Sequence, residues 1–201
     1  MQFKAIVWDV RHCSVLRVLE GHTGAVFSVD LDESSELAFT ASGDKTVGVW
    51  QLSSGLCLKR LKHTNGLPVV ALQWQEGYIA SCSGSTITLW SVDGWKKVME
   101  FQGHEGQVMV GVGREGRVEC AQLRVRDPTN CAGTVLSSSR DKTIKYWDIH
   151  SGRCLQTLSG HAGPVNGIDW NEVFITSASD DGDVRIWDFH PCHNRIGLAP
   201  S

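Results

Sequence analysis

Residues 21–31 (GHTGAVFSVDL) and 39–50 (FTASGDKTVGVW) carry the pattern that decides the fold, because closely similar segments return twice further along the chain. The first return is GHEGQV at 103–108 with LSSSRDKTIKYW at 136–147. The second is GHAGPVNGIDW at 160–170 with TSASDDGDVRIW at 176–187. Self-similarity at a spacing of roughly 20 to 50 residues marks repeat architectures. The chain is therefore built from repeated units.

Two residue types show the period of these units. The tryptophans that close each apolar run are Trp8, Trp50, Trp90, Trp147 and Trp187, at spacings of 42, 40, 57 and 40 residues. The histidines His22, His63, His104 and His161 recur at spacings of 41, 41 and 57. The unit at 63–102 is degenerate, since Lys62 stands before its histidine and SGSTITLW (83–90) contains no Asp. We expect that unit to be looser than the others.

Each unit contains short runs of alternating polarity, such as 46–50 and 143–147, separated by turns rich in Gly, Ser and Asp. This alternation predicts four antiparallel strands per unit. A single sheet of this size exposes apolar surface on both faces, and stacking such sheets around an axis buries it while leaving only short edges. The pattern therefore predicts an all-β propeller.

The Gly-His start and the Trp-terminated last run resemble the WD40 repeat family, over residues 3–189. The resemblance implies a WD40-type β-propeller of four to four and a half blades, each of four antiparallel strands, as part of a larger seven-bladed ring. We expect a partial blade at 1–20, blades at about 21–62, 63–102 and 103–159, a three-stranded last blade at 160–189, and a tail at 190–201. Alternatively, strand 14–19 completes the last blade and closes a four-bladed ring, which would leave the strand ending at Asp9 surplus.

Ser, His and Asp recur together in each good unit, a combination that also occurs in hydrolases. A catalytic site is normally built once, so a set that returns with the blade period indicates a structural role, and we predict no catalytic residue. In WD40 proteins the corresponding residues form a buried hydrogen-bond chain from Asp through His and a hydroxyl to the Trp indole. The spacing leaves two hydroxyls open in each unit: Thr40 or Ser42, Ser137 or Ser139, and Ser177 or Ser179. The predicted network is His22, Ser42, Asp44, Trp50, His104, Ser139, Asp141, Trp147, His161, Ser179, Asp181 and Trp187.

The resemblance also implies where partners bind. In this family the residue before the turn Asp and the first residues of the innermost strand point to the rim of the central channel. The corresponding positions here are Gly43, Arg140, Asp180, Ala25, Phe27, Gln107, Pro164 and Asn166, with Lys45 and Lys142 nearby. We expect the Arg140 guanidinium to make bidentate bonds to a carboxylate or phosphate. The alternative is a solvated surface cation.

The segments 48–63 (GVWQLSSGLCLKRLKH) and 144–161 (IKYWDIHSGRCLQTLSGH) resemble the propellers of F-box/WD proteins, which are substrate receptors of SCF-type ubiquitin ligases. This implies binding of degrons or other peptides, phosphorylated ones among them, and of ligase subunits through regions outside this chain. The first alternative is a general WD40 scaffold for complex assembly or signalling. The second, less favoured, is a hydrolase.

The composition of the chain argues against some classes of binding partner. A net charge of -3 and a pI near 6.2 give no general attraction to nucleic acid or to anionic membranes. Seven cysteines without metal-like spacing indicate free thiols and a cytoplasmic or nuclear location. We expect no cofactor, and we interpret the ligand-type residues of 189–193 as fortuitous because no second half-site accompanies them. The insertion near 109–134 is either a functional loop or disordered, with disorder slightly favoured.

Overall fold

The computed structural model describes residues 3–75, 77–105, 121–124, 133–170 and 174–188 of the 201, and of 121–124 and 170 it describes the backbone alone. In these residues the chain forms antiparallel sheets and one short 3₁₀ helix. Each sheet is one blade, and the blades are numbered 1 to 5 along the chain. The all-β propeller architecture predicted from the repeats is confirmed.

The strands of each blade follow one another in chain order, from the innermost strand outwards. Blade 1 has β1 (Phe3–Asp9) and β2 (Ser14–His22). Blade 2 has β3 (Val26–Asp32), β4 (Leu37–Ser42), β5 (Thr46–Gln51) and β6 (Cys57–Lys62). Blade 3 has β7 (Val69–Gln75), β8 (Tyr78–Ser83), β9 (Thr86–Ser91) and β10 (Lys96–Phe101), with the 3₁₀ helix η1 (Asp93–Trp95) before β10. Blade 4 has β11 (Ala121–Arg124), β12 (Thr134–Ser138), β13 (Thr143–Asp148) and β14 (Cys154–Ser159). Blade 5 has β15 (Val165–Trp170), β16 (Phe174–Ser179) and β17 (Val184–Asp188).

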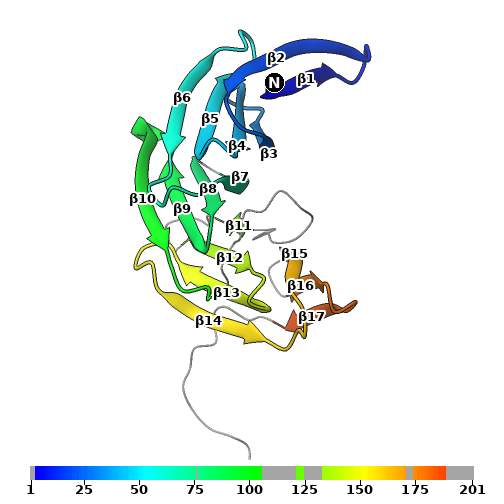
Figure 1. Ribbon diagram of the computed structural model, residues 1–201, viewed down its shortest axis with the longest axis vertical. Helices are drawn as coiled ribbons and strands as arrows, with labels where there is room; N and C mark the ends of the chain where they lie inside the picture. The colour runs from blue at the N-terminus through cyan, green and yellow to red at the C-terminus, as the bar shows by residue number, and fades with distance from the viewer. Residues whose placement is uncertain (1–2, 76, 106–120, 125–132, 171–173, 189–201) are drawn as a thin grey trace, which may run out of the picture.

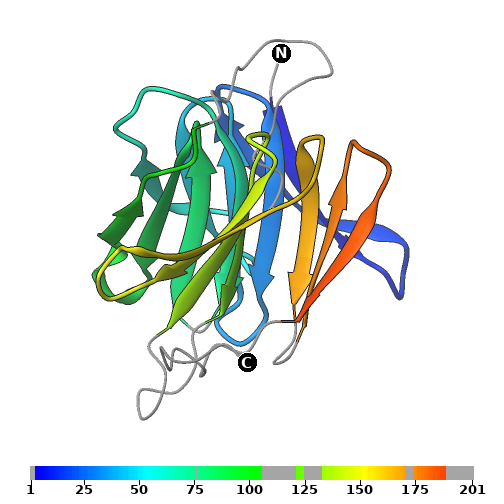
Figure 2. The same ribbon diagram turned by 90° about the horizontal axis from the view of Figure 1, so that it is seen from below.

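The blades lie one after another along an arc, with the outermost strands β6, β10 and β14 on its convex side and β7 and β11 on its concave side (Figure 1). Turned by 90°, the sheets stand side by side with their strands running between two opposite faces of the arc (Figure 2). Within the described residues β17 pairs only with β16, and β2 pairs with β1. The alternative in which strand 14–19 completes the last blade is therefore not the arrangement in this structure.

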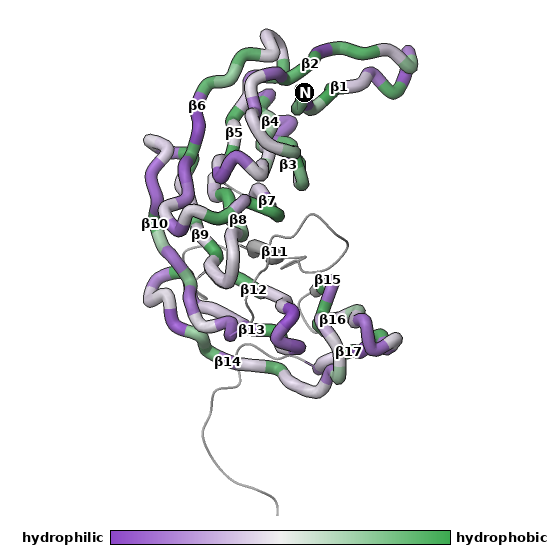
Figure 3. The backbone as a smooth tube through the Cα atoms, viewed as in Figure 1, coloured by the Kyte–Doolittle hydropathy of each residue, from purple (hydrophilic) through white to green (hydrophobic). Residues whose placement is uncertain are grey.

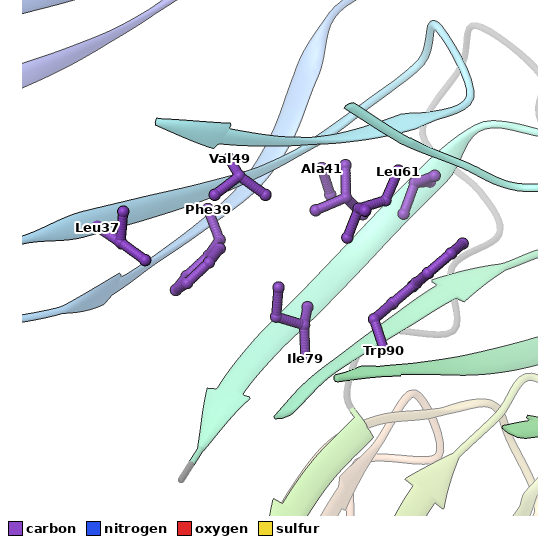
Figure 4. Close-up of a cluster of buried hydrophobic side chains, with 9 residues drawn as sticks. Leu37, Phe39, Ala41, Val49, Leu61, Ile79 and Trp90 are labelled. Atoms are coloured by element: carbon purple, nitrogen blue, oxygen red, sulfur yellow. The ribbon is translucent and has the colours of Figure 1, made fainter. Parts of the chain in front are cut away.

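The core lies between successive blades. β4 is buried along its whole length and β5 over four of its six residues, so these middle strands present apolar side chains to both neighbouring blades. One cluster joins blade 2 to blade 3, where Phe39 and Val49 face Ile79 and Trp90 (Figure 4). A second cluster joins blade 3 to blade 4 and a third joins blade 4 to blade 5. Stacking of blades thus buries both faces of a sheet, as the repeat pattern predicts.

The outermost strands are more polar and more exposed. β6 and β10 carry several hydrophilic residues on the outside of the arc (Figure 3). Only Leu61 is buried in β6, and only Phe101 in β10. The innermost strands β3 and β7 are linked instead by polar contacts, since Asp30 accepts a hydrogen bond from the Trp74 backbone N–H at 2.7 Å. Most of the insertion near 109–134 lies outside the described residues.

Candidate functional site

A buried hydrogen-bond chain runs through blade 2 beneath the face that carries the β4–β5 turn. The Trp50 indole N–H donates to Thr40 Oγ1 at 2.8 Å, and Thr40 Oγ1 lies 2.7 Å from His22 Nε2. On the other side of the ring, His22 Nδ1 lies 2.6 Å from an Asp44 carboxylate oxygen. Because the carboxylate can only accept, His22 donates through Nδ1–H and accepts from the Thr40 hydroxyl through Nε2. Each polar group in this hydrogen-bond network therefore has a partner.

The same geometry returns in blades 4 and 5. Trp147 donates to Ser137 Oγ at 2.8 Å, and Trp187 donates to Ser177 Oγ at 2.9 Å. The histidine links are His104 to Ser137 at 2.8 Å, His104 to Asp141 at 2.7 Å, His161 to Ser177 at 2.8 Å and His161 to Asp181 at 2.8 Å. The arrangement is thus a property of the blade and recurs with its period.

Of the two hydroxyls left open in each unit, the one closer to the start of the chain joins His to Trp. The predicted network instead includes Ser42, Ser139 and Ser179. These serines do not link the histidine to the tryptophan and make other hydrogen bonds. Ser42 Oγ donates to the Gly24 carbonyl at 2.9 Å and accepts from the Asp44 backbone N–H at 3.1 Å. Ser139 and Ser179 accept from the backbone N–H of Asp141 and Asp181, both at 3.2 Å. These serines hold the turn that carries the aspartate.

The carboxylates of this network remain ionised. Burial alone would raise the pKa of Asp44, but hydrogen bonds from Thr46, His22 and the Thr23 backbone N–H outweigh it and leave the pKa below its usual value. The balance is the same for Asp141, where burial is outweighed by bonds from His104 and Thr143 and the pKa is held well below its usual range. Ionised carboxylates in a nearly buried place stabilise the fold only while these donors stay in place.

The hydroxyls of the network are enclosed. Thr40, Ser137 and Ser177 are at most 2% exposed, and each already contacts a histidine and a tryptophan. A hydrolytic nucleophile has to reach a substrate carbonyl, and none of these oxygens can do so without opening the blade. The geometry therefore supports the structural interpretation of the Ser, His and Asp sets.

Blade 3 lacks the aspartate and is held differently. His63 Nε2 lies 2.7 Å from Ser81 Oγ, and the Trp90 indole N–H donates to the same oxygen at 2.8 Å. The turn after β8 contains only Gly84 and Ser85, and Asn65 bridges to it. Asn65 donates to the Ser83 carbonyl at 2.7 Å and accepts from Ser83 Oγ at 2.9 Å. Sequence reasoning missed Asn65, although it stands where the other units have Gly24, Gly106 and Gly163.

The predicted rim residues of blades 2 and 5 lie where a turn meets the start of an innermost strand. Phe27 is 40% exposed and lies against Gly43, where an added Cβ would be 3.3 Å from the phenyl ring. Asn166 donates to the Asp180 carboxylate. Each pair brings together the two segments that the sequence assigned to one rim.

The cationic rim residues lie on the turns of blades 2 and 4. Lys45 and Lys142 are exposed and occupy corresponding positions with positive φ, 74° and 69°. Arg140 is half-buried on the turn of blade 4. Gln107 lies outside the described residues.

Backbone hydrogen bonds fix the turns of this rim, and one of them joins blade 4 to blade 5. The His63 backbone N–H, just after β6, donates to the Lys45 carbonyl at 3.1 Å and extends the β5–β6 ladder of blade 2 to the Lys45 turn. The Val165 backbone N–H at the start of β15 donates to the Ser139 carbonyl at 3.1 Å, which brings the Arg140 turn next to Asn166. Arg140, Asn166 and Asp180 are thereby gathered from two blades, so this part of the rim offers both a cation and a carboxylate.

The described residues contain no cluster of three or more His, Cys, Asp or Glu side chains suited to a metal ion. The ligand-type residues of 189–193 fall outside them. No helix in the described part of the chain is long and apolar enough to cross a membrane. The described cysteines Cys13, Cys57, Cys82 and Cys154 are free thiols.

Comparison with known proteins gives related sequences over most of this chain. "Nuclear distribution protein PAC1" of Arthroderma benhamiae is 30% identical over 177 residues, covering 85% of this chain and 37% of that protein. "Nuclear distribution protein nudF" of Emericella nidulans is 30% identical over 185 residues, covering 86% and 41%. "Autophagy-related protein 16" of Arabidopsis thaliana is 27% identical over 175 residues, covering 85% and 31%. The chain thus spans less than half the length of these relatives.

Solved structures show the same fold. The computationally designed Ika8 protein superposes with a TM-score of 0.73 at 24% identity, covering 92% of this chain and 52% of that one. The WD40 β-propeller domain of Doa1 superposes with a TM-score of 0.70 at 23% identity, covering 91% and 56%. The family model described as "WD domain, G-beta repeat" matches residues 13–51, 95–148 and 152–188, more than half of the chain. The chain therefore belongs to the WD-repeat family.

Proposed function

We propose that this chain is a protein-interaction module that binds segments of partner proteins on the rim formed by the blade turns and the starts of the innermost strands. The observation that carries the proposal is the convergence of Arg140, Asn166 and Asp180 from two adjacent blades. Hydrogen bonds from strand to turn hold this part of the rim at its base, so it can bind a partner without first being ordered.

The charge of the rim suits a segment of mixed polarity. Lys45, Arg140 and Lys142 place cations on blades 2 and 4, whereas Asp180 and Asp183 place carboxylates on blade 5. An acidic or phosphorylated side chain fits the former and a basic one the latter. Exposed Phe27 adds an apolar anchor on blade 2.

Among the two binding roles derived from the sequence, the general scaffold is favoured over the receptor of a ubiquitin ligase. The relatives described above are nuclear distribution proteins and an autophagy-related protein, and no F-box protein is among them. The likeness of 48–63 and 144–161 to F-box/WD propellers is accounted for by features common to WD repeats. We therefore propose a role in complex assembly, in the cytoplasm or the nucleus.

The experiment is an affinity capture with the immobilised chain, in which bound proteins are quantified by mass spectrometry. Arg140→Ala and Phe27→Ala should each lose the specific partners of the unmodified chain. Arg153→Ala and Leu155→Ala, on the exposed outer strand β14 or just before it, are the matched controls and should retain them. Partners that bind all four variants equally would show that the rim is not the binding surface.

A second experiment tests whether Arg140 binds phosphate. Synthetic peptides from a captured partner, with and without phosphate, are titrated against the chain and against Arg140→Gln. Tighter binding of the phosphopeptide that disappears in Arg140→Gln would assign Arg140 to phosphate. Equal binding of both peptides would show that Arg140 does not recognise phosphate.

A further inference from the structure

The carboxylate oxygen of each network aspartate occupies one fixed place beside its histidine. In blades 2, 4 and 5 this oxygen lies 2.6 Å, 2.7 Å and 2.8 Å from histidine Nδ1. It also accepts the backbone N–H of the next residue, at 3.1 Å from Thr23, 3.1 Å from Glu105 and 2.8 Å from Ala162. Two donors thus converge on a single anionic oxygen in three blades.

Blade 3 keeps the histidine and loses the carboxylate. His63 is 3% exposed and oriented as its counterparts are, through Ser81. Its Nδ1 has only a long contact of 3.4 Å with Thr88 Oγ1. The next residue, Thr64, is exposed, and its turn partners Gly84 and Ser85 carry no acidic side chain. The donors that converge on aspartate elsewhere therefore meet no carboxylate from the turn here.

A cavity of about 180 Å³ lies at this place. His63, Thr64 and Thr88 line it together with Lys62, Lys97 and Glu100. Glu100 supplies the carboxylate of this pocket, and it is engaged by Lys97 Nζ at 3.1 Å and by Thr64 Oγ1 at 3.5 Å. Two ammonium groups against one carboxylate leave the lining with an excess of positive charge.

We propose that this cavity binds a carboxylate group, which takes the place of the missing aspartate and accepts from His63 Nδ1–H and the Thr64 backbone N–H. The carboxylate belongs either to a small free anion or to an acidic side chain of a partner. Lys62 supplies the compensating charge, and Lys97 adds to it. The site is distinct from the rim that carries the proposed function and does not depend on it.

The protonation state of His63 agrees with this role. Burial lowers the pKa of His63 to about 4, and the nearby Glu100 carboxylate only partly counteracts this. The imidazole is therefore neutral at pH 7. We assign to His63 the tautomer that the aspartates fix in blades 2, 4 and 5, in which Nε2 accepts from the Ser81 hydroxyl and the single ring proton is on Nδ1, at the cavity.

The test is a titration of the ¹⁵N-labelled chain with sodium acetate at constant ionic strength, with sodium chloride as the reference salt. The Thr64 amide signal should shift and saturate. The Thr23, Glu105 and Ala162 amides should not move, because their acceptors are covalently supplied. Failure of Thr64 to saturate, or equal shifts at all four amides, would overturn the proposal.

Two substitutions sharpen the test. Lys97→Gln should weaken acetate binding about 2- to 5-fold, and Glu100→Gln should strengthen it by a similar factor, as expected for partly exposed charges. A graft that replaces Gly84-Ser85 by Gly-Asp-Lys, combined with Asn65→Gly, restores the turn of blade 2 and should abolish the response. If the graft folds and still responds, acetate binds elsewhere.

A titration with a short peptide distinguishes the two sources of the carboxylate, a free anion and an acidic side chain. Acetyl-Gly-Asp-Gly-amide is titrated beside its Asn counterpart and beside acetate. Saturation at lower concentration with the Asp peptide than with acetate would assign the site to acidic side chains. Tighter binding of acetate would assign it to free anions, and an equal response to the Asn peptide would contradict carboxylate recognition altogether.

Discussion

Blades 2 and 3 are neighbours with the same four strands and the same His, hydroxyl and Trp link, yet they fix their turns by different means. In blade 2 the β4–β5 turn brings Asp44 to His22. In blade 3 the turn is shorter, and Asn65 holds it through Ser83. The comparison teaches that the His to Trp link is the part that both blades need, whereas the aspartate can be replaced by another bridge.

Turn length explains the choice between Gly and Asn. A Cβ at Gly24 would lie 2.5 Å from the Asp44 backbone nitrogen, so the longer turn leaves room only for glycine. The shorter turn of blade 3 leaves room for the Asn65 side chain.

The outer strands of the two blades differ in charge at one corresponding position. Arg60 of β6 pairs with Gly48, whereas Glu100 of β10 pairs with Thr88.

The largest effect is expected from removing the hydroxyl of blade 2. Thr40→Val strands both the Trp50 N–H and His22 Nε2 inside the blade, which should lower the unfolding free energy by about 4 kcal/mol. The corresponding Ser81→Ala should cost only about 2 kcal/mol, because His63 has a cavity beside it in which to reorient. Denaturant unfolding measures both, with Thr40→Ser as the control that keeps the hydroxyl. Equal costs in the two blades would contradict the assigned difference.

The next effect is the pH dependence that His63 gives to stability. In the unfolded chain the His63 side chain has a pKa near 6.5, whereas burial in the folded chain lowers this pKa to about 4. Because the unfolded state binds more protons in this interval, the unfolding free energy should fall by about 3 kcal/mol as the pH drops through it. The lowered pKa values of Asp44 and Asp141 act below this interval, where protonation of the carboxylates removes further stability.

The measurement is a series of chemical unfolding curves between pH 7 and pH 4 for the unmodified chain and for His63→Asn. The variant should show a flatter profile, since groups other than His63 contribute equally to both. Parallel profiles would mean that native His63 is protonated as easily as in the unfolded chain.

A smaller effect distinguishes the two turn bridges. Gly24→Ala drives a methyl group into the backbone of the Asp44 turn and should cost about 2 kcal/mol. Asn65→Ala removes two hydrogen bonds at the edge of blade 3 and should cost about 1 kcal/mol. Thermal unfolding compares them with Gly167→Ala, at a position without positive φ and with open space, as the control for replacing a glycine without a clash. A Gly24→Ala cost no larger than that of the control would refute the steric explanation.

The smallest effect concerns the outer strands. The Arg60 guanidinium lies 5.7 Å from the centre of the Trp50 ring and 3.5 Å from an Asp44 oxygen, with a third of its side chain exposed. Arg60→Gln should therefore lower stability by at most about 1 kcal/mol. Glu100→Gln should change it by less than about 0.5 kcal/mol, since Lys97 and Thr64 hold Glu100 at a partly exposed place. Equal losses would show that the ring contact adds nothing.

The sequence predicts which residues form the rim but not which contacts these residues make. The resemblance to WD40 repeats implies rim positions such as Phe27, Asp180 and Asn166. The resemblance does not give their contacts, because Asn166 on β15 meets Asp180 in the turn after β16, and the Arg140 turn comes next to Asn166 only where blades 4 and 5 join.

The sequence by itself determined the repeat, the strands and the His, Asp and Trp that recur in each unit, because strand alternation and turn residues act over a few positions. It could not choose between Thr40 and Ser42, since residues two apart in a strand point to the same side. Only the tertiary structure decided that choice, together with the role of Asn65 and the cavity beside His63. Each depends on side chains about 20 to 40 residues apart meeting in space, and periodicity brings such residues near one another without fixing which atoms bond.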